Sequence, residues 1–314
     1  RFELSCGFRR IVRFAFCTGC QTGTSSVTDI VWRPLNRLNQ QLPEGIKVYE
    51  GEAKRLPLRA WYVEVDEPDP RIRTDIVTST DTDRRETVSS FARRLNAHVV
   101  VNGGYFRMDT DPARHVGLLL DDGRLIEPSI SAVTYNSQKY PLARAALGIT
   151  KDDRLDIVWT FNRGDTLLVL DEPLDNHPDS PDSVFRRSTA GSQWNVYDAV
   201  GGGPALISNG KIRITTDEEV FFGTSIPKIH PRTACGYRAD GALIILVVDG
   251  RQYNSRGVNL QELAAIMQNL GCVEALNLDG GGSSTLVVAG HLVNQPAGNS
   301  VEREVMSALA VFSK

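Results

Sequence analysis

Three Asx-Gly dipeptides place the strongest constraint on what this chain can fold into. Each stands between two apolar runs: Asp122-Gly123, Asn209-Gly210 and Asp240-Gly241. Asp or Asn followed by Gly accepts the positive φ angles of a two-residue hairpin turn, so each dipeptide predicts a pair of antiparallel strands. Ala289-Gly290 is a weaker signal of the same kind. The sequence therefore predicts a sheet that is rich in antiparallel hairpins.

Two segments have the periodicity of amphipathic helices. In residues 87–95 the apolar side chains recur at i, i+3, i+4 and i+7, and residues 260–270 also carry one apolar face. Asn259 is placed as the N-cap of the second helix, Glu262 completes a capping box, and Gly271 provides a C-terminal stop. We expect both helices to pack on the sheet.

Apolar runs rich in β-branched and aromatic residues predict strands. They cover residues 60–66, 99–101, 243–248 and 273–278. Hairpins combined with few helices favour the α+β class, with a mixed sheet rich in antiparallel hairpins and a few packed helices, over a doubly wound sheet. No linker divides residues 46–314, so we expect a single large domain there, with residues 27–45 as a connecting segment.

Residues 1–26 form a leader of unusual composition. Arg9 and Arg10 precede a short apolar stretch, which Gly19-Cys20 follows. The leader is similar to the end of an export signal, with Gly19-Cys20 at the position of a lipoprotein cleavage site. Two interpretations remain open: the remnant of an export signal, or a disordered and vestigial N-terminus. Under the first, we expect a secreted or envelope-attached protein, anchored as a lipoprotein if Cys20 carries the lipid.

Composition excludes several classes of partner. The net charge is -3 and no basic stripe is present, so we expect no nucleic-acid binding. No run approaches the roughly 20 apolar residues that a membrane-spanning helix needs, so no transmembrane segment is expected. No Cys-His grouping has metal-ligand spacing, and we expect neither a metal nor another cofactor. Cys235 and Cys272 lie in apolar, strand-like contexts and are expected to be buried free thiols.

A glycine-rich turn directly after the predicted strand 273–278 is the best candidate for a binding site. Its sequence is Asp279-Gly280-Gly281-Gly282-Ser283-Ser284. Successive glycines allow backbone N–H groups to point into an anion-sized nest. The serine hydroxyls add donors, and the strand end holds the Asp279 carboxylate beside the nest. The alternative is a structural turn in which Asp279 only caps the backbone, but the adjoining carboxylate and hydroxyls favour a site.

A second glycine-containing segment follows the predicted strand 99–101. Its sequence is Asn102-Gly103-Gly104-Tyr105-Phe106. Asn102 can donate and accept hydrogen bonds, and the glycines permit a ligand to approach the backbone. Tyr105 or Phe106 is suited to face a sugar ring, although a β-turn with core aromatic residues explains the segment equally well. A further cluster, Gly201-Gly202-Gly203, either lines the same pocket or bends the chain.

Arg232 and Asp249 are expected at the same edge of the sheet. Arg232 lies near the start of one strand and Asp249 ends the next, and the third of the Asx-Gly turns joins these two strands. The planar guanidinium of Arg232 matches the oxygens of phosphate, and Thr233 adds a hydroxyl. The neighbouring His230 is either an acid or base or, as is more common, a surface histidine.

Taken together, these residues suit a phosphate flanked by a sugar. Arg232 and the backbone N–H groups of the glycine turns would bind the phosphate and stabilise charge on the leaving group. Asp279 or Asp249 would act as nucleophile or general base on the glycosyl side, and Asn102 completes the predicted catalytic set. The predicted substrate-binding residues are Gly103, Gly104, Tyr105, Phe106, Gly201, Gly202, Gly203, Thr233, Gly280, Gly281, Gly282, Ser283 and Ser284.

Four motifs occur together within residues 46–314, and their order and spacing are specific. They are Asn102-Gly103-Gly104-Tyr105-Phe106, His230-Pro231-Arg232-Thr233-Ala234, Val248-Asp249-Gly250-Arg251 and Leu278-Asp279-Gly280-Gly281-Gly282-Ser283-Ser284. In this arrangement the sequence resembles the phosphodiester glycosidase family. The resemblance implies a mixed α/β fold whose motifs converge on one pocket, and a hydrolase that removes a sugar from phosphate. It also implies export, because many bacterial members resemble exported proteins that act on envelope or extracellular glycopolymers.

Two other functions remain open. A non-catalytic phosphoglycan- or carbohydrate-binding module on the same scaffold would keep the arginine and the glycines, but the presence of Asp249 and Asp279 favours catalysis. A metal-dependent phosphodiesterase needs several His and Asp residues at ligand spacing, and the 5 histidines of this chain are scattered. We therefore predict a hydrolase for a sugar-1-phosphodiester in a phosphoglycan or envelope glycopolymer, working without a metal.

Overall fold

Strands dominate the fold. The computed structural model describes residues 29–53, 55–186, 188, 190–298 and 301–314, so the leader predicted for residues 1–26, with Cys20, lies outside the described residues. Every strand pair that the structure describes is antiparallel. Only two helices in this part of the chain reach eight residues. The expected antiparallel hairpins and few helices are therefore present, but the expected α+β class with a mixed sheet is corrected to a strongly sheet-rich, antiparallel fold.

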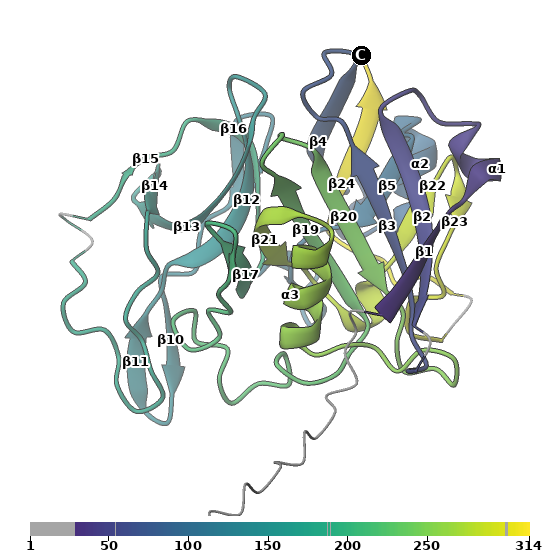
Figure 1. The fold of residues 1–314 in the computed structure, drawn as a ribbon. Helices are drawn as coiled ribbons and strands as arrows, with labels where there is room; N and C mark the ends of the chain where they lie inside the picture. The colour runs from purple at the N-terminus through teal and green to yellow at the C-terminus, as the bar shows by residue number, and fades with distance from the viewer. Residues whose placement is uncertain (1–28, 54, 187, 189, 299–300) are drawn as a thin grey trace, which may run out of the picture.

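The central element is a sheet of eight strands (Figure 1). In spatial order it contains β1 (Ile30–Pro34), β2 (Ile46–Ala53), β3 (Arg59–Val65), β20 (Leu243–Val248), β19 (Arg232–Arg238), β21 (Cys272–Asn277), β17 (Ala205–Ser208) and β18 (Lys211–Ile212). Two of the predicted hairpins are confirmed here, since Asn209-Gly210 joins β17 to β18 and Asp240-Gly241 joins β19 to β20. Because β1 pairs with β2, the expected connecting segment 27–45 contributes a strand of its own, together with the short helix α1 (Asn36–Asn39).

Two further large sheets flank the central one. The five-stranded sheet has the order β23 (His291–Leu292), β22 (Leu286–Val288), β5 (Val99–Asn102), β24 (Ser307–Ser313) and β4 (Ile72–Thr78). The seven-stranded sheet has the order β15 (Ser192–Gln193), β14 (Thr166–Leu170), β13 (Leu155–Arg163), β12 (Arg144–Thr150), β16 (Val196–Gly201), β8 (Leu119–Asp121) and β9 (Arg124–Glu127). The other two predicted hairpins are also confirmed, because Asp122-Gly123 joins β8 to β9 and Ala289-Gly290 joins β22 to β23.

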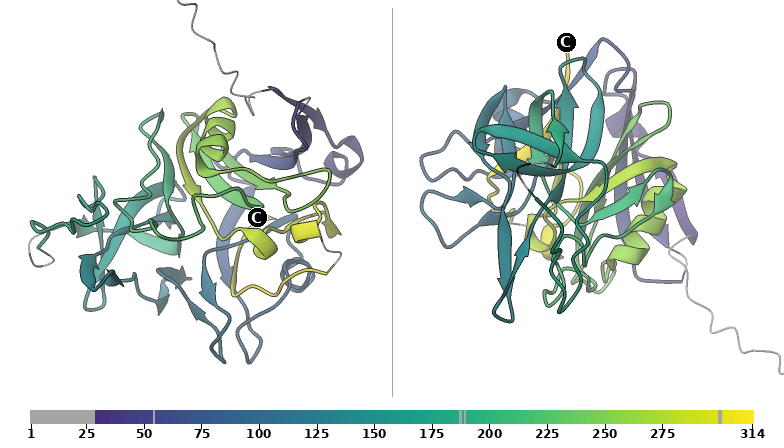
Figure 2. Two further views of the ribbon diagram at one scale, coloured as in Figure 1. Left: turned by 90° about the horizontal axis from the view of Figure 1, so that it is seen from below. Right: turned by 90° about the vertical axis from the view of Figure 1, so that its left-hand side faces the viewer.

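Two small ribbons complete the strands. They are β6 (Phe106–Arg107) with β7 (Arg114–His115), and β10 (Ala132–Tyr135) with β11 (Gln138–Pro141). Short 3-10 segments of the described chain are η2 (Gly281–Ser283) and η3 (Pro296–Gly298). Figure 2 shows the teal strands of the seven-stranded sheet to one side of the other two sheets.

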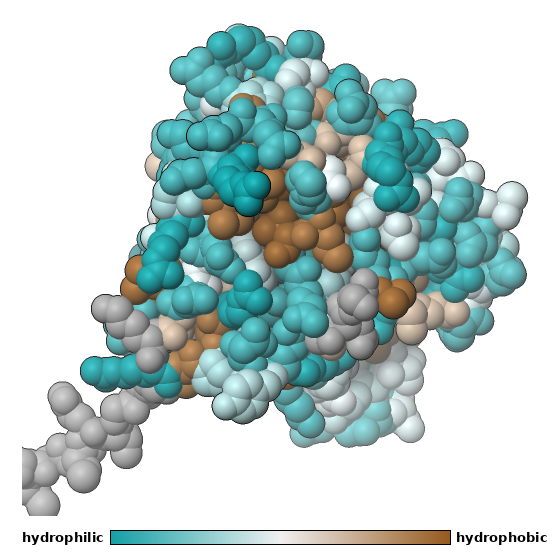
Figure 3. Space-filling model, turned by 90° about the vertical axis from the view of Figure 1, so that its right-hand side faces the viewer, coloured by the Kyte–Doolittle hydropathy of each residue, from teal (hydrophilic) through white to brown (hydrophobic). Residues whose placement is uncertain are grey.

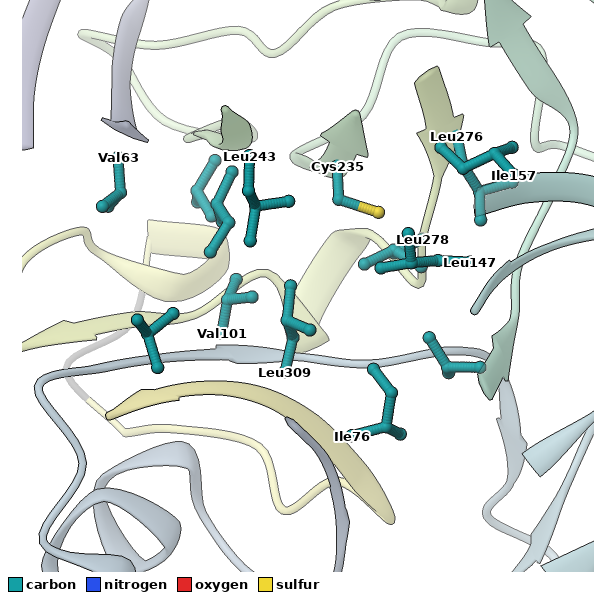
Figure 4. Packing of buried hydrophobic residues seen from close by; sticks show 14 of the residues in the cluster. Val63, Ile76, Val101, Leu147, Ile157, Cys235, Leu243, Leu276, Leu278 and Leu309 are labelled. Carbon is teal, nitrogen blue, oxygen red and sulfur yellow. The ribbon is translucent and has the colours of Figure 1, made fainter. Parts of the chain in front are cut away.

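One apolar core joins the three large sheets (Figure 4). The central sheet, the five-stranded sheet and the seven-stranded sheet each contribute side chains to it: Val63, Cys235, Leu243 and Leu276 from the first, Ile76, Val101 and Leu309 from the second, and Leu147 and Ile157 from the third. Both Cys235 and Cys272 are buried and free, as predicted. Shared packing of this kind makes the sheets a single structural unit rather than separate domains.

Strand β20 shows why some apolar runs are uninterrupted. Its alternate residues Leu243, Ile245 and Val247 face the common core, whereas Ile244, Leu246 and Val248 face a second cluster that includes Leu263 and Met267 of α3 (Leu260–Asn269). Both faces of the strand are therefore covered, and no position is left for a polar residue. On the other side of the molecule, α2 (Val88–Leu95) covers the outer face of the five-stranded sheet in the same way.

The surface is mostly hydrophilic on the face that Figure 3 shows, where polar side chains surround a central apolar area and smaller ones beside it. No helix in the described part of the chain is long and apolar enough to cross a membrane.

Helix α3 begins and ends as the sequence predicts, to within one residue. The Asn259 side chain accepts a hydrogen bond from Glu262 N (2.8 Å), and the Glu262 carboxylate accepts one from Asn259 N (3.0 Å). Gly271 follows with φ +88°. This reciprocal capping satisfies two backbone donors that the helix itself leaves unpaired.

Replacing Asn259 by Ala should therefore lower the free energy of unfolding by about 1 kcal/mol, because the cap of the helix that covers the central sheet is lost. Chemical denaturation measures this change. Gln261→Ala, at an exposed position of the same helix, is the matched control and should leave the unfolding free energy within about 0.5 kcal/mol of the parent. Equal effects of the two substitutions would contradict the role of the cap.

Candidate active site

The two predicted glycine segments meet at the ends of β5 and β21. Asp279 N donates a hydrogen bond to Gly103 O (3.2 Å), and the Asn102 side chain donates one to Asp279 O (2.8 Å). Each segment leaves a helix, forms a buried strand and then turns through glycines. The similarity seen in the sequence thus corresponds to two strand ends that lie side by side.

A small pocket of about 210 Å³ opens beside this junction. Its lining consists of Tyr105, Ser225, Ile226, His230, Arg232, Arg251, Asp279, Gly280, Gly281, Gly282 and Arg303. Three arginines and one carboxylate make the lining strongly cationic. None of the three arginines is in an ion pair with a carboxylate of the described residues. Guanidinium groups without a carboxylate partner are the expected lining of a site for an anion.

Asp279 is the only carboxylate in this lining. Burial raises the pKa of Asp279 to about 6, while the Ser283 hydroxyl, Arg303 and the Gly280 N–H group act in the opposite direction. Ser283 Oγ does not meet hydrogen-bond geometry with any described residue, so its influence comes from proximity alone. A carboxylate with a pKa close to neutral is suited to accept or return a proton during a reaction.

Arg232 is buried, with 2% of its surface exposed. Its Nε donates to Val258 O (3.0 Å), and its Nη2 donates to Ile226 O (2.6 Å) and to Lys228 O. Burial lowers the pKa of Arg232 to about 10, and the nearby Arg251 contributes to this shift. The guanidinium therefore fixes the loop before β19, and it leaves Nη1 without a hydrogen bond to the described residues.

The other two arginines lie against the glycine turn. A Cβ built on Gly282 would overlap the guanidinium of Arg303, and one built on Gly281 would lie 3.3 Å from Arg251 Nη2. Gly281 also has φ +64°, which favours glycine. These glycines therefore make room for two cationic side chains, in addition to any room that they give to a ligand.

Asn102 and Thr233 lie outside the pocket lining and support it from below. The Asn102 amide accepts hydrogen bonds from Thr233 Oγ1 (2.7 Å) and Thr285 N (3.2 Å), in addition to its bond with the Asp279 carbonyl. Asn102, Thr233 and Thr285 are all buried. These positions indicate that Asn102 holds Asp279 in place and does not contact the substrate.

Tyr105 does line the pocket, through a hydroxyl that is fixed by the protein. It donates to Gly203 O (2.8 Å) and accepts from Asn277 Nδ2 (2.7 Å). Burial, followed by the charge of Asp279, raises the pKa of Tyr105. The ring therefore stays neutral and in place.

Asp249 lies next to Arg232 in the sheet, as predicted, because Val248 pairs with Arg232 in the β19–β20 register. Its carboxylate nevertheless points elsewhere. It accepts hydrogen bonds from Asn294 Nδ2 (3.0 Å) and Gln295 N (3.2 Å), and the residue is fully buried. Burial raises the pKa of Asp249, an effect that these donors partly offset. The arrangement favours a structural role, with Asp279 as the aspartate that faces the pocket.

The remaining predicted binding residues also lie outside the lining. Gly103, Gly104, Gly201, Gly202 and Gly203 are packed so closely that a Cβ on any of them would collide with neighbouring backbone or side chains. Phe106 packs against the core, and Ser283 and Ser284 are buried below the turn. Close packing therefore accounts for the five glycines without a ligand. The buried hydroxyls of Ser283 and Ser284, by contrast, have no hydrogen-bond partner among the described residues.

Sequence reasoning missed Arg303 and left Arg251 out of the predicted set. Arg251 was visible in the motif that ends with Gly250-Arg251, but its role needs the fold to place it beside Gly281. Arg303 stands between Glu302 and Glu304 in a charged stretch, which is typical of an exposed segment. No local pattern distinguishes it.

A larger hollow, of about 640 Å³, lies at the opposite end of the β19–β20 hairpin. It contains none of the predicted site residues, and several of its charged side chains pair with one another, as in Arg238–Asp240 and Lys314–Asp153. Among the described residues, no three His, Cys, Asp or Glu side chains are grouped so that they could hold a metal ion.

Gly282→Ala should displace the Arg303 guanidinium without unfolding the turn, because Gly282 has no positive φ and the colliding group is the end of a flexible side chain. We expect a fall in kcat/KM of roughly tenfold, the scale of one lost charge-assisted contact, with an unchanged unfolding midpoint. In an Arg303→Ala background the same change should have no further effect. A full additional loss in that background would show that the glycine serves another purpose.

The chain matches the sequence profile described as "Phosphodiester glycosidase" over residues 95–312. It is 32% identical over 223 residues to mouse N-acetylglucosamine-1-phosphodiester alpha-N-acetylglucosaminidase, an alignment that covers 68% of this chain and 36% of the relative. It is 27% identical over 230 residues to a prophage-derived uncharacterized protein of Bacillus subtilis, covering 73% of this chain and 30% of that protein. The chain thus spans about a third of the length of these curated relatives.

The fold is also similar to a solved structure, the catalytic domain of zebrafish N-acetylglucosamine-1-phosphodiester alpha-N-acetylglucosaminidase auto-inhibited by its pro-peptide. The TM-score is 0.61 at 23% identity, and the match covers 86% of this chain and 83% of that chain. The profile match extends from the last residue of α2 into β24, and so includes the whole pocket. The chain belongs to the phosphodiester glycosidase family.

Proposed function

We propose that the chain hydrolyses a sugar-1-phosphodiester at the pocket that Asp279 lines. The observation that carries the proposal is one carboxylate, with a pKa raised to about 6, among three arginines that have no ion-pair partner in the described chain. Arg232, Arg251 and Arg303 would bind the phosphate, and Asp279 would act as nucleophile or general base toward the anomeric carbon.

The charge of the pocket fits the charge that such a reaction develops. A phosphodiester carries one negative charge, and breaking the bond between the anomeric carbon and oxygen leaves a phosphomonoester with a second. Three guanidinium groups and one carboxylate leave an excess of two positive charges. The pocket would therefore favour the departing phosphate over the bound diester, which is the condition for catalysis by electrostatic stabilisation.

The same argument explains why one carboxylate would suffice. Most glycosidases use a pair, because the second protonates a poor leaving group. A phosphomonoester has a second pKa of about 6, so it departs without a proton from the protein. Asp249, the other candidate, would not be needed for this step, which agrees with its hydrogen bonds to Asn294 and Gln295.

The names of the mammalian relatives describe cleavage of N-acetylglucosamine from a phosphodiester. We propose the same linkage type for this chain, in a phosphoglycan or envelope glycopolymer. The proposed location, outside the cytoplasm or attached to the envelope, is supported by the composition of the leader, including Gly19-Cys20.

The competing function is a module that binds a phosphoglycan without cleaving it. Asp279 argues against this function, since a carboxylate that faces a bound phosphate repels it and weakens binding. A site selected for binding alone would gain by losing the charge, whereas a hydrolase needs it.

The direct test is turnover of the methyl diester of N-acetylglucosamine 1-phosphate in ¹⁸O-water, with a chelator present. We expect free sugar and methyl phosphate, with the label in the sugar hydroxyl because the C–O bond is cleaved. Label in the phosphate would show attack at phosphorus instead. Binding without turnover would favour the non-catalytic module, and loss of turnover only on chelation would favour a metal-dependent enzyme.

Asp279→Asn should lower kcat by roughly 100-fold or more, because the amide cannot act as base or nucleophile. Its unfolding free energy at pH 7 should be kept or raised, since the neutral amide avoids the cost of burying a charge. In the parent, kcat should be low at a pH below about 6, where Asp279 is protonated, and should rise as the pH increases and Asp279 ionises. Asp249→Asn is the control: it should destabilise the protein, yet keep this acidic limb of the pH profile.

A further inference from the structure

The hydrogen bonds of His230 fix which of its ring nitrogens carries the proton. Nε2 lies 2.8 Å from Ser225 O, and a carbonyl oxygen only accepts, so Nε2 donates. Nδ1 lies 3.2 Å from Arg251 Nη2, and a guanidinium only donates, so Nδ1 accepts. The imidazole is therefore neutral, with its proton on Nε2 and its lone pair directed at Arg251.

We propose that His230 is a positioning residue that holds Arg251 over the glycine turn in the orientation that binds the substrate phosphate. The proposal rests on the function proposed for this pocket. His230 itself would not be the acid or base, because each of its nitrogens already has a protein partner.

Arg251 has little else to hold its guanidinium. The contact with His230 is the only hydrogen bond from its side chain to the described residues, and no ion pair restrains it. Its backbone, by contrast, is held in the left-handed region with φ +59°. The next residue, Gln252, donates from Nε2 to Gln295 O (2.7 Å) and fastens the turn. A fixed backbone and one side-chain contact leave the position of the cation dependent on His230.

The backbone of His230 is held equally firmly. Its N donates to Val258 O (3.1 Å), and its carbonyl accepts from Val258 N (3.0 Å), which forms an isolated β-bridge. Arg232 donates from Nε to the same Val258 carbonyl (3.0 Å). The Val258 carbonyl therefore holds both His230, which orients Arg251, and Arg232.

Burial, together with the neighbouring cations, keeps the His230 ring neutral. Burial lowers the pKa of His230 most strongly, and the cations Arg232, Arg251 and Lys228 act in the same direction against the hydrogen bond to Ser225 O. Asp279 and Arg303 complete the charged lining of the pocket. Protonation would place an N–H group on Nδ1, facing the donor of Arg251, and would release that guanidinium.

Two substitutions separate the two hydrogen bonds of the ring. His230→Asn places an amide oxygen near the position of Nδ1 and so keeps the acceptor for Arg251. His230→Gln places an amide N–H near the position of Nε2, keeps the bond to Ser225 O and loses the acceptor. The two variants are similar in polarity, so they form a matched pair.

The readouts are KM and kcat for the methyl diester of N-acetylglucosamine 1-phosphate and the inhibition constant of inorganic phosphate. We expect His230→Gln to raise KM and the phosphate inhibition constant by about tenfold, the effect of losing one hydrogen bond to a charged group, with a smaller change in kcat. His230→Asn should restore most of the loss. In an Arg251→Ala background, His230→Gln should have no further effect on phosphate inhibition.

The pH profile provides a readout that a merely structural role would not change. In an Asp279→Asn background, where that carboxylate no longer titrates, affinity for inorganic phosphate should fall at a pH below the ordinary histidine range, because His230 becomes protonated and Arg251 is released. His230→Asn should lack this component in that background, and on its own it should keep the dependence of kcat on Asp279.

The proposal is overturned if His230→Gln binds phosphate like the parent, or if its loss persists undiminished in the Arg251→Ala background. It is also overturned if His230→Asn is as impaired as His230→Gln while both retain the parental unfolding midpoint. A parent that neither binds phosphate nor cleaves the diester would instead refute the proposed function, so the two failures are distinguishable.

Discussion

The geometry of the pocket depends on the buried amide of Asn102. It binds the Asp279 carbonyl, accepts from Thr233 at β19 and accepts from the backbone of Thr285 before β22. One side chain therefore connects three chain segments with the end of β5. Because the amide is buried, each of these bonds is costly to leave unmade, and together they favour the observed arrangement of the strand ends. The carboxylate, the glycine turn and the first arginine all take their positions from that junction.

The positive charge of the pocket arises because its arginines, unlike most others, are not paired with carboxylates of the described chain. Across the described surface most arginines pair with a nearby carboxylate, as Arg94 does with Glu86 and Arg59 with Glu50. Around Asp279 the protein instead satisfies guanidinium groups with neutral acceptors, namely backbone carbonyls for Arg232 and an imidazole for Arg251. Neutral partners hold a cation in place without cancelling its charge. The pocket thus combines fixed geometry with a field that attracts anions.

Local patterns predicted most of the architecture around the site. The four hairpin turns, both helices with their boundaries, and the common edge of Arg232 and Asp249 all follow from short-range signals. The class was less well predicted, because strands such as β12 and β13 have weak individual signals and become strands by packing against one another. When these strands are included, the fold consists mostly of sheets and is no longer a mixture of helices and hairpins.

The site was predictable where a residue type and its backbone position coincide. Asp279 follows a buried strand and precedes three glycines, and that local context is enough to single it out. The local sequence does not show in which direction a side chain points. For this reason the sequence predicts Asp249 and Asp279 together, although the Asp249 carboxylate binds the segment at Asn294. Arg303 is distant in sequence from every other lining residue except the turn itself, and only the tertiary fold brings it to Gly282.

The contact between Gly282 and Arg303 has a consequence for how this site could diverge. The guanidinium occupies the volume that a side chain at position 282 would need, so the two positions cannot change independently. A descendant that shortened Arg303 would both remove a positive charge and open space for a new side chain on the turn. The charge and the shape of the pocket would then change together. Few substitutions would be needed to turn a phosphate site into a site for a neutral group.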